Sequence, residues 1–120
     1  MTTITDGPDR RNWQQLARNI LGRARPHAIL SISAHWESDG ATLLTGQEFP
    51  PTIHDFRGFP QELFDIQYPA RGDAALIQRV TDLLPGADID LSHEWGLDHG
   101  SWGVLHPMVP EADIPVVQMS

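Results

Sequence analysis

Three of the six histidines stand in surroundings where an imidazole could do chemistry. The first is His35, which directly follows the apolar run 28–34 and lies in the stretch Ser33-Ala34-His35-Trp36-Glu37. Ligands of open α/β sheets bind beyond the carboxyl ends of strands, so His35 is well placed to bind a metal or to transfer a proton. A core histidine hydrogen-bonded to the backbone is the alternative, and position alone does not choose between the two.

The other two candidates are His54 and His99. His54 precedes Asp55, whose carboxylate could orient the ring, although the spacing alone favours a capped turn. His99 lies within 95–102, where glycines let the backbone approach a ligand closely and tryptophans can wall an apolar pocket. A structural turn is the alternative there too.

The remaining histidines, His27, His93 and His106, lack such settings and are expected to be surface or structural residues. No two histidines have the His-x-x-x-His spacing of a helical zinc site. Cysteine is absent, so any metal must be held by His, Asp or Glu. The residues by themselves therefore indicate a site with three convergent histidines and leave its chemistry open.

Helices and strands alternate in the elements that must position these histidines. Apolar positions at helical spacing predict a helix over 13–21, with Asp9 as its N-cap and Gly22 at its end, and a second helix that Asp73 caps and Pro85-Gly86 terminates. A short helix is predicted over 101–108, and strands are predicted over 28–34, 41–45, 89–91 and 114–119. This alternation is typical of an α/β fold with a mostly parallel sheet.

Two segments carry further structural expectations. The nearly continuous apolar run 28–34 predicts a central parallel strand that is buried on both faces. Residues 46–72 are rich in proline, glycine and aromatic side chains and show no long periodicity, which favours a packed, functional loop over a disordered one.

Length, composition and charge limit the class of protein. The chain has 120 residues, 40% of them hydrophobic, which suits one small domain, and its net charge of −8 argues against a nucleic-acid or anionic-membrane partner. The basic residues are all arginines, mostly between positions 10 and 25, and are interpreted as a solvated helix face. The sequence contains neither a membrane-span pattern nor a signal pattern, so a cytoplasmic protein is expected.

Several motifs occur together in a specific order. They are the stretch 33–37, the segment Pro51-Thr52-Ile53-His54-Asp55-Phe56 continuing through 58–60, the run Tyr68-Pro69-Ala70, the segment Gly96-Leu97-Asp98-His99-Gly100-Ser101-Trp102, and the closing strand 114–120. In this order and spacing, the chain from about Trp13 to its last residue resembles the DODA-type, LigB-like extradiol aromatic ring-opening dioxygenases, relatives of the protocatechuate ring-opening enzymes.

The resemblance implies a role for each candidate residue. It assigns the catalytic metal, Fe(II) or Zn(II), to His35 and a second-sphere acid–base role to His99. It places His54, Asp55 and Trp102 at the substrate pocket. The implied reaction opens a catechol-type, DOPA-like ring with O₂ beside the two hydroxyl-bearing carbons.

The chain also departs from the family pattern. The family has a metal-binding histidine in an N-terminal His-Gly-Ser-Pro-Met stretch, and aligning backwards from Trp13 places Met1 on the methionine of that stretch. A second half of similar length, with a catalytic and a ligand histidine, would follow Ser120. We therefore expect residues 1–120 to be a partial catalytic domain with impaired activity, open to association into a homo-oligomer. The alternatives are a small zinc-dependent hydrolase using His35, His54 and His99, or a non-catalytic fragment that pairs with another chain.

Overall fold

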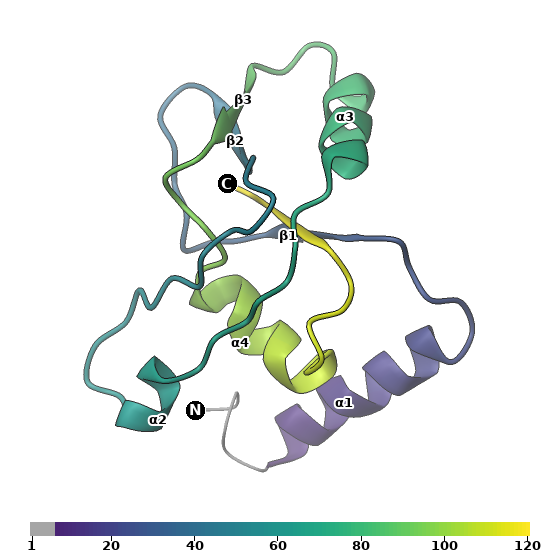
Figure 1. Cartoon of the computed structure of the whole chain (residues 1–120), viewed down its shortest axis with the longest axis vertical. Coiled ribbons are helices and arrows are strands. Elements are labelled where there is room, and N and C mark those ends of the chain that lie inside the picture. The colour runs from purple at the N-terminus through teal and green to yellow at the C-terminus, as the bar shows by residue number, and fades with distance from the viewer. Residues whose placement is uncertain (1–6) are drawn as a thin grey trace.

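Helices and strands alternate along the chain in the computed structural model, which describes residues 7–120 (Figure 1). The expectation for Met1 lies outside these residues. The elements are α1 (Pro8–Leu21), β1 (Ile29–Ile32), β2 (Thr42–Thr45), α2 (Gln61–Phe64), α3 (Ala74–Leu83), β3 (Ile89–Ser92), α4 (His99–Met108) and β4 (Val116–Met119). Among residues 7–120, no helix is both long enough and apolar enough to cross a membrane.

The strands form one mixed sheet in the order β1-β4-β2-β3. The pairs β1–β4 and β2–β3 are parallel, and they are joined where β2 meets β4 in antiparallel register at Leu44 and Met119. The prediction of an α/β fold with a mostly parallel sheet is therefore confirmed. The crossover between β1 and β4 brings residues far apart in sequence to the same edge of the sheet.

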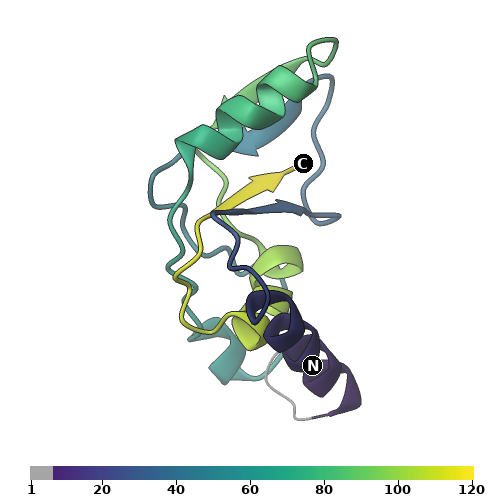
Figure 2. The ribbon, with the colours of Figure 1, turned by 90° about the vertical axis from the view of Figure 1, so that its right-hand side faces the viewer.

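Helices cover the two faces of this sheet, as the perpendicular views show (Figures 1 and 2). On one face, Val80 of α3 packs against Leu44 and Val117. On the other face, Trp102 and Leu105 of α4 share a core with Val116 and with buried side chains of the long loop. The helix α1 packs against α4. Near the start of α4, Ser101 forms hydrogen bonds with Ser31 of β1 and Gln118 of β4.

The prediction that β1 is a central strand buried on both faces is wrong. It is an edge strand that pairs with β4 alone among the described strands, and Leu30 and Ile32 are 37% and 66% exposed. The apolar run has the composition of a covered strand, but α3 packs over β2 and β4 instead. Composition indicates which side chains tend to be buried. It does not indicate which other helices or strands lie close enough to bury them.

The start of α1 also differs from expectation. Gly7, not Asp9, is the N-cap, and Asp9 lies in the first turn. Proline is favoured at the first helical position because its fixed φ is already helical and its missing N–H would have no partner there. Pro8 therefore starts the helix before Asp9 can cap it. Gly22 ends the helix as predicted.

The long segment 46–72 is a packed loop, as its aromatic content predicts. It contains the single turn α2, and Thr52 forms a bridge with Leu97. Tyr68 is 1% exposed and donates its hydroxyl to the carbonyl of Val109 at 2.8 Å. These contacts tie the loop to the segments on both sides of α4 and so fix His54 and Asp55 beside the helix start.

Candidate metal and acid–base site

His35 lies just beyond the carboxyl end of β1, where the sequence placed it. Its Nδ1 is 2.8 Å from Oδ2 of Asp55, and the side chain is 43% exposed. A carboxylate only accepts hydrogen bonds, so a neutral His35 carries its proton on Nδ1. The Nε2 atom makes no hydrogen bond with the described residues and offers a lone pair. This is how an imidazole is prepared for a metal, with a carboxylate fixing the opposite nitrogen.

Asp55 connects the two histidines. While Oδ2 faces His35, Oδ1 accepts the backbone N–H of His99 at 2.8 Å. The carboxylate is 15% exposed and bridges the end of β1 to the first residue of α4. Both oxygens are engaged with the protein, so the geometry favours an orienting role for Asp55 over the substrate contact that the resemblance implies.

His99 is the first residue of α4, and its ring faces that of His35 at a centroid distance of 6.0 Å. Phe56 and Trp102 pack against the His99 ring, each at 5.0 Å. Its Nε2 is buried and has no hydrogen-bond partner among the described residues. Burial lowers the pKa of His99, the neighbouring His35 adds to this effect, and Asp55 and Asp98 oppose it. A neutral ring with an unused nitrogen can accept a proton.

His54 and Trp102 lie behind this pair. The Nε2 of His54 is 2.8 Å from the carbonyl of Ile66, to which it donates. Trp102 is fully buried and donates its indole N–H to the carbonyl of Ile53. The two rings contact each other at 5.5 Å. Trp102 contacts the His99 ring directly, and His54 packs against Trp102.

Sequence reasoning missed a buried acidic residue next to the site. Asp98 is fully buried, and its carboxylate accepts hydrogen bonds from Ser33 at 2.6 Å, Gln118 at 2.8 Å and the indole of Trp95 at 3.1 Å. Gln118 was the available signal, because a glutamine inside the otherwise apolar strand 114–119 must find a buried polar partner.

Potential metal ligands converge in the described part of the chain at His35, Asp55 and Asp98, whose ligand atoms all lie within 4.8 Å of one another. Imidazole nitrogen and carboxylate oxygen are the donor types of non-haem iron and zinc sites, so the residues fit such a metal in kind. The oxygens of both carboxylates already accept hydrogen bonds. Within this group, Nε2 of His35 makes no hydrogen bond with the described residues, and the two carboxylates lie near the His35 ring.

The other histidines lie outside this cluster. His27 and His93 are exposed. His106 lies within α4, and burial together with the charge of Arg10 lowers its pKa. Its Nδ1 is buried without a partner among the described residues. None of the three belongs to the group of converging ligands.

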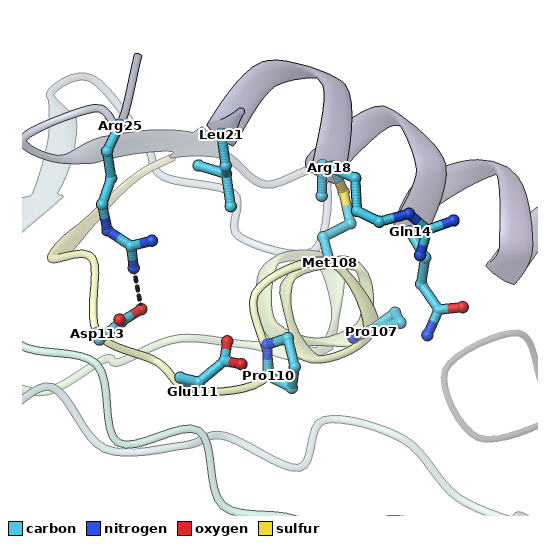
Figure 3. Close-up of a pocket in the computed structure, with 10 residues that line it drawn as sticks. Gln14, Arg18, Leu21, Arg25, Pro107, Met108, Pro110, Glu111 and Asp113 are labelled. Carbon is cyan, nitrogen blue, oxygen red and sulfur yellow. Dashed lines mark ion pairs between the residues drawn. The ribbon is translucent and has the colours of Figure 1, made fainter. Parts of the chain in front are cut away.

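A separate groove of about 510 Å³ lies between α1 and the end of α4 (Figure 3). Arg25 and Asp113 form an ion pair at its rim, and each of these side chains is about half exposed. Such exposed pairs contribute little to stability. The groove is lined by Gln14, Ala17, Arg18, Leu21, Arg25, Pro107, Met108, Pro110, Glu111 and Asp113. Neither His35 nor His99 lines this groove.

Known proteins are similar to this chain in sequence and in fold. The chain is 51% identical over 121 residues to the 4,5-DOPA dioxygenase extradiol of Escherichia coli K12, an alignment that covers 100% of this chain and 43% of that protein. It is 41% identical over 123 residues to the protein of the same name from Beta vulgaris, covering 100% of this chain and 46% of the relative. The chain thus spans less than half the length of these curated relatives.

A solved structure agrees with the fold. The crystal structure of an uncharacterized protein from Escherichia coli K12 superposes with a TM-score of 0.71 at 42% identity, covering 98% of this chain and 41% of that one. Residues 2–120 match the family described as the catalytic LigB subunit of aromatic ring-opening dioxygenase. On the strength of this match and of these relatives, the chain belongs to the LigB family of aromatic ring-opening dioxygenases.

Proposed function

We propose that this chain is the N-terminal part of the catalytic domain of an extradiol dioxygenase that opens a catechol-type, DOPA-like ring with O₂. Its membership of the LigB family and the names of its relatives support the reaction class. One structural observation carries the assignment to residues. Asp55 holds both His35 and His99, with the two rings 6.0 Å apart and an unused nitrogen on each.

LigB dioxygenases use a non-haem metal, and in this chain His35 would hold it through Nε2. Ferrous iron, when bound, supplies the Lewis acidity and redox chemistry by which a diol and dioxygen react. Asp55 keeps the proton of His35 on Nδ1, which leaves the lone pair of Nε2 free. In this supporting role, Asp55 would orient the His35 ring and tune its affinity for the metal without contacting the metal itself.

His99 is the acid–base residue in this proposal. A catechol must lose a proton to chelate well, and a neutral imidazole can accept that proton and return it later. Burial keeps the pKa of His99 below its ordinary value, so the ring is neutral near pH 7 and ready to accept. Phe56 and Trp102 cover the ring, exclude water from it and hold its orientation.

The zinc-hydrolase alternative requires His35, His54 and His99 to converge as ligands. In the described part of the chain, the group of converging ligand atoms includes neither His54 nor His99. The Nε2 of His54 is also engaged with the carbonyl of Ile66. The geometry therefore favours the dioxygenase.

The decisive experiment measures oxygen uptake and metal content in the full-length protein that contains this chain. With ferrous iron and a catechol, the wild type should consume O₂ and yield a ring-opened product. His35→Ala should lose stoichiometric iron or zinc by elemental analysis, whereas His27→Ala, a change at an exposed histidine, should retain both metal and turnover. Unchanged metal content in His35→Ala would refute the ligand assignment, and hydrolysis without O₂ uptake would refute the reaction class.

A further inference from the structure

A group of buried polar side chains with hydrogen-bond partners lies next to the two histidines, and only Asp98 among them has entered the site described above. Ser33, Asp98, Ser101 and Gln118 are 3%, 0%, 1% and 0% exposed. Burial of polar groups is unfavourable unless each finds a hydrogen-bond partner. Asp and Gln are mostly exposed in folded proteins, so a buried pair of them beside two candidate functional histidines indicates a specific role.

The hydrogen bonds run from β4 to the backbone of His35. Gln118 donates Nε2–H to Oδ2 of Asp98 at 2.8 Å, and its Oε1 accepts the backbone N–H of Asp98 at 3.0 Å. Oδ1 of Asp98 accepts the hydroxyl of Ser33 at 2.6 Å. The Ser33 oxygen in turn accepts the backbone N–H of His35 at 3.1 Å. Three side chains thus connect β4, the start of α4 and the segment that carries His35.

Two further observations show that this connection shapes the site. Asp98 is the N-cap residue of α4, but its side chain makes no capping hydrogen bond and turns toward Ser33 and Gln118 instead. Gly100 leaves room for it, since a Cβ at that position would lie 2.6 Å from Oγ of Ser33, 3.1 Å from Asp98 and 3.3 Å from Cδ2 of His35. The helix therefore lacks a side-chain cap, and Gly100 occupies a position where any larger residue would clash with this network.

We propose that Ser33, Asp98 and Gln118 are positioning residues that hold His35 in register with Asp55. The inference rests on the proposed function, because it assigns a purpose to the ligand orientation of His35. The bond between Ser33 and the His35 N–H fixes the turn that follows β1. That turn delivers Nδ1 of His35 to Asp55, and the pairing keeps Nε2 available to a metal.

A purely structural role is distinguished by a matched pair of variants on the same strand. Ser31 and Ser33 each make a hydroxyl hydrogen bond toward α4, Ser31 with Ser101 at 2.7 Å and Ser33 with Asp98. The hydroxyl of Ser33 also accepts the N–H of His35, and no hydrogen bond of the Ser31 hydroxyl reaches that residue. Ser33→Ala and Ser31→Ala therefore each remove one hydroxyl hydrogen bond toward α4. Only Ser33→Ala also removes the hydrogen bond to the backbone N–H of His35.

The first readout is the tautomer of His35, measured from imidazole ¹⁵N shifts of the chain at pH 8. Wild type and Ser31→Ala should hold the proton on Nδ1, and Ser33→Ala should show a mixture of tautomers. Gln118→Met, which removes the opposite end of the network, should shift the tautomer in the same direction. This readout needs no metal. The unfolding midpoint of each variant, followed by circular dichroism, confirms that it is folded.

The second readout is the Zn²⁺ affinity of the full-length protein that contains this chain, measured by competition with a chromophoric chelator. Ser33→Ala should bind about 10-fold more weakly than wild type, as loss of outer-sphere support typically causes, and Ser31→Ala should change less than about twofold. Equal effects of the two serine variants, or an unshifted tautomer in both Ser33→Ala and Gln118→Met, would overturn the positioning role. Loss of Zn²⁺ binding in His35→Ala beside such a result would leave the ligand assignment standing, so the two proposals can fail separately.

Discussion

Replacing Gly100 by alanine adds one methyl group at the point where three parts of the site meet. The new Cβ would lie 2.6 Å from Oγ of Ser33, closer than real Cβ contacts come, and 3.1 Å from a carboxylate oxygen of Asp98. Asp98 cannot yield easily, because it is fully buried and held by three donors. Ser33 must therefore move, and its 2.6 Å bond to Asp98 must lengthen or break.

Opposing free-energy contributions set the size of the stability change in Gly100→Ala. Alanine in a helix is favoured over glycine by at most about 1 kcal/mol. Overpacking a well-packed interior costs about 1–3 kcal/mol, and weakening a hydrogen bond to a buried charged group about 1.5–3 kcal/mol. We expect Gly100→Ala to lower the free energy of unfolding by about 2 kcal/mol, which for a chain of this size lowers Tm by roughly 8 °C.

Urea unfolding followed by tryptophan fluorescence measures this loss. Gly86→Ala is the matched control, since a Cβ at Gly86 meets nothing within 4 Å, and it should change stability by less than about 0.5 kcal/mol. The ¹⁵N shifts of His35 should move in Gly100→Ala and stay unchanged in Gly86→Ala. A Gly100→Ala variant as stable as wild type would show that the network accommodates the added methyl group and is not closely packed at this position.

Two further predictions concern His99, and a third concerns the exposed edge strand β1. In the full-length protein, His99→Gln should retain its metal and lose about 100- to 10,000-fold in turnover, because the proton acceptor is gone. Steady-state oxygen uptake measures this loss. A loss below about fivefold would favour the structural-turn interpretation. Burial lowers the pKa of His99 in the fold, so the unfolded chain binds more protons as pH falls below the ordinary histidine value of about 6.5. The stability that a neutral His99 contributes is thus complete above that pH and declines below it, and urea midpoints at pH 7.5 and 5.5 should differ less in His99→Gln than in wild type. Finally, Ile32 is 66% exposed on the edge strand β1, so Ile32→Lys should reduce self-association of the 120-residue chain in sedimentation velocity without lowering its unfolding midpoint; equal association of the two forms would place the contact elsewhere.

The sequence by itself was enough to predict the position of His35 and the order of the elements apart from the single turn α2. Helical periodicity, the stop at Gly22 and the short apolar runs are local signals, because side-chain spacing and backbone restrictions act within a few residues. A histidine directly after a strand lies at the sheet's carboxyl edge wherever that strand is placed. The structure accordingly shows all four strands within one or two residues of most predicted boundaries, and His35 just beyond β1.

Only the tertiary structure determined which side chains contact one another and which are buried. Asp55 reaches His35 across 20 positions, and Gln118 reaches Asp98 across 20 others, because the loop and β4 happen to converge on the same end of the sheet. The edge position of β1 and the burial of Nε2 of His99 likewise depend on which neighbours are present. Local propensity reflects the chemistry of each residue, whereas burial, hydrogen-bond partners and pKa shifts are set by atoms that the chain brings together only when it folds.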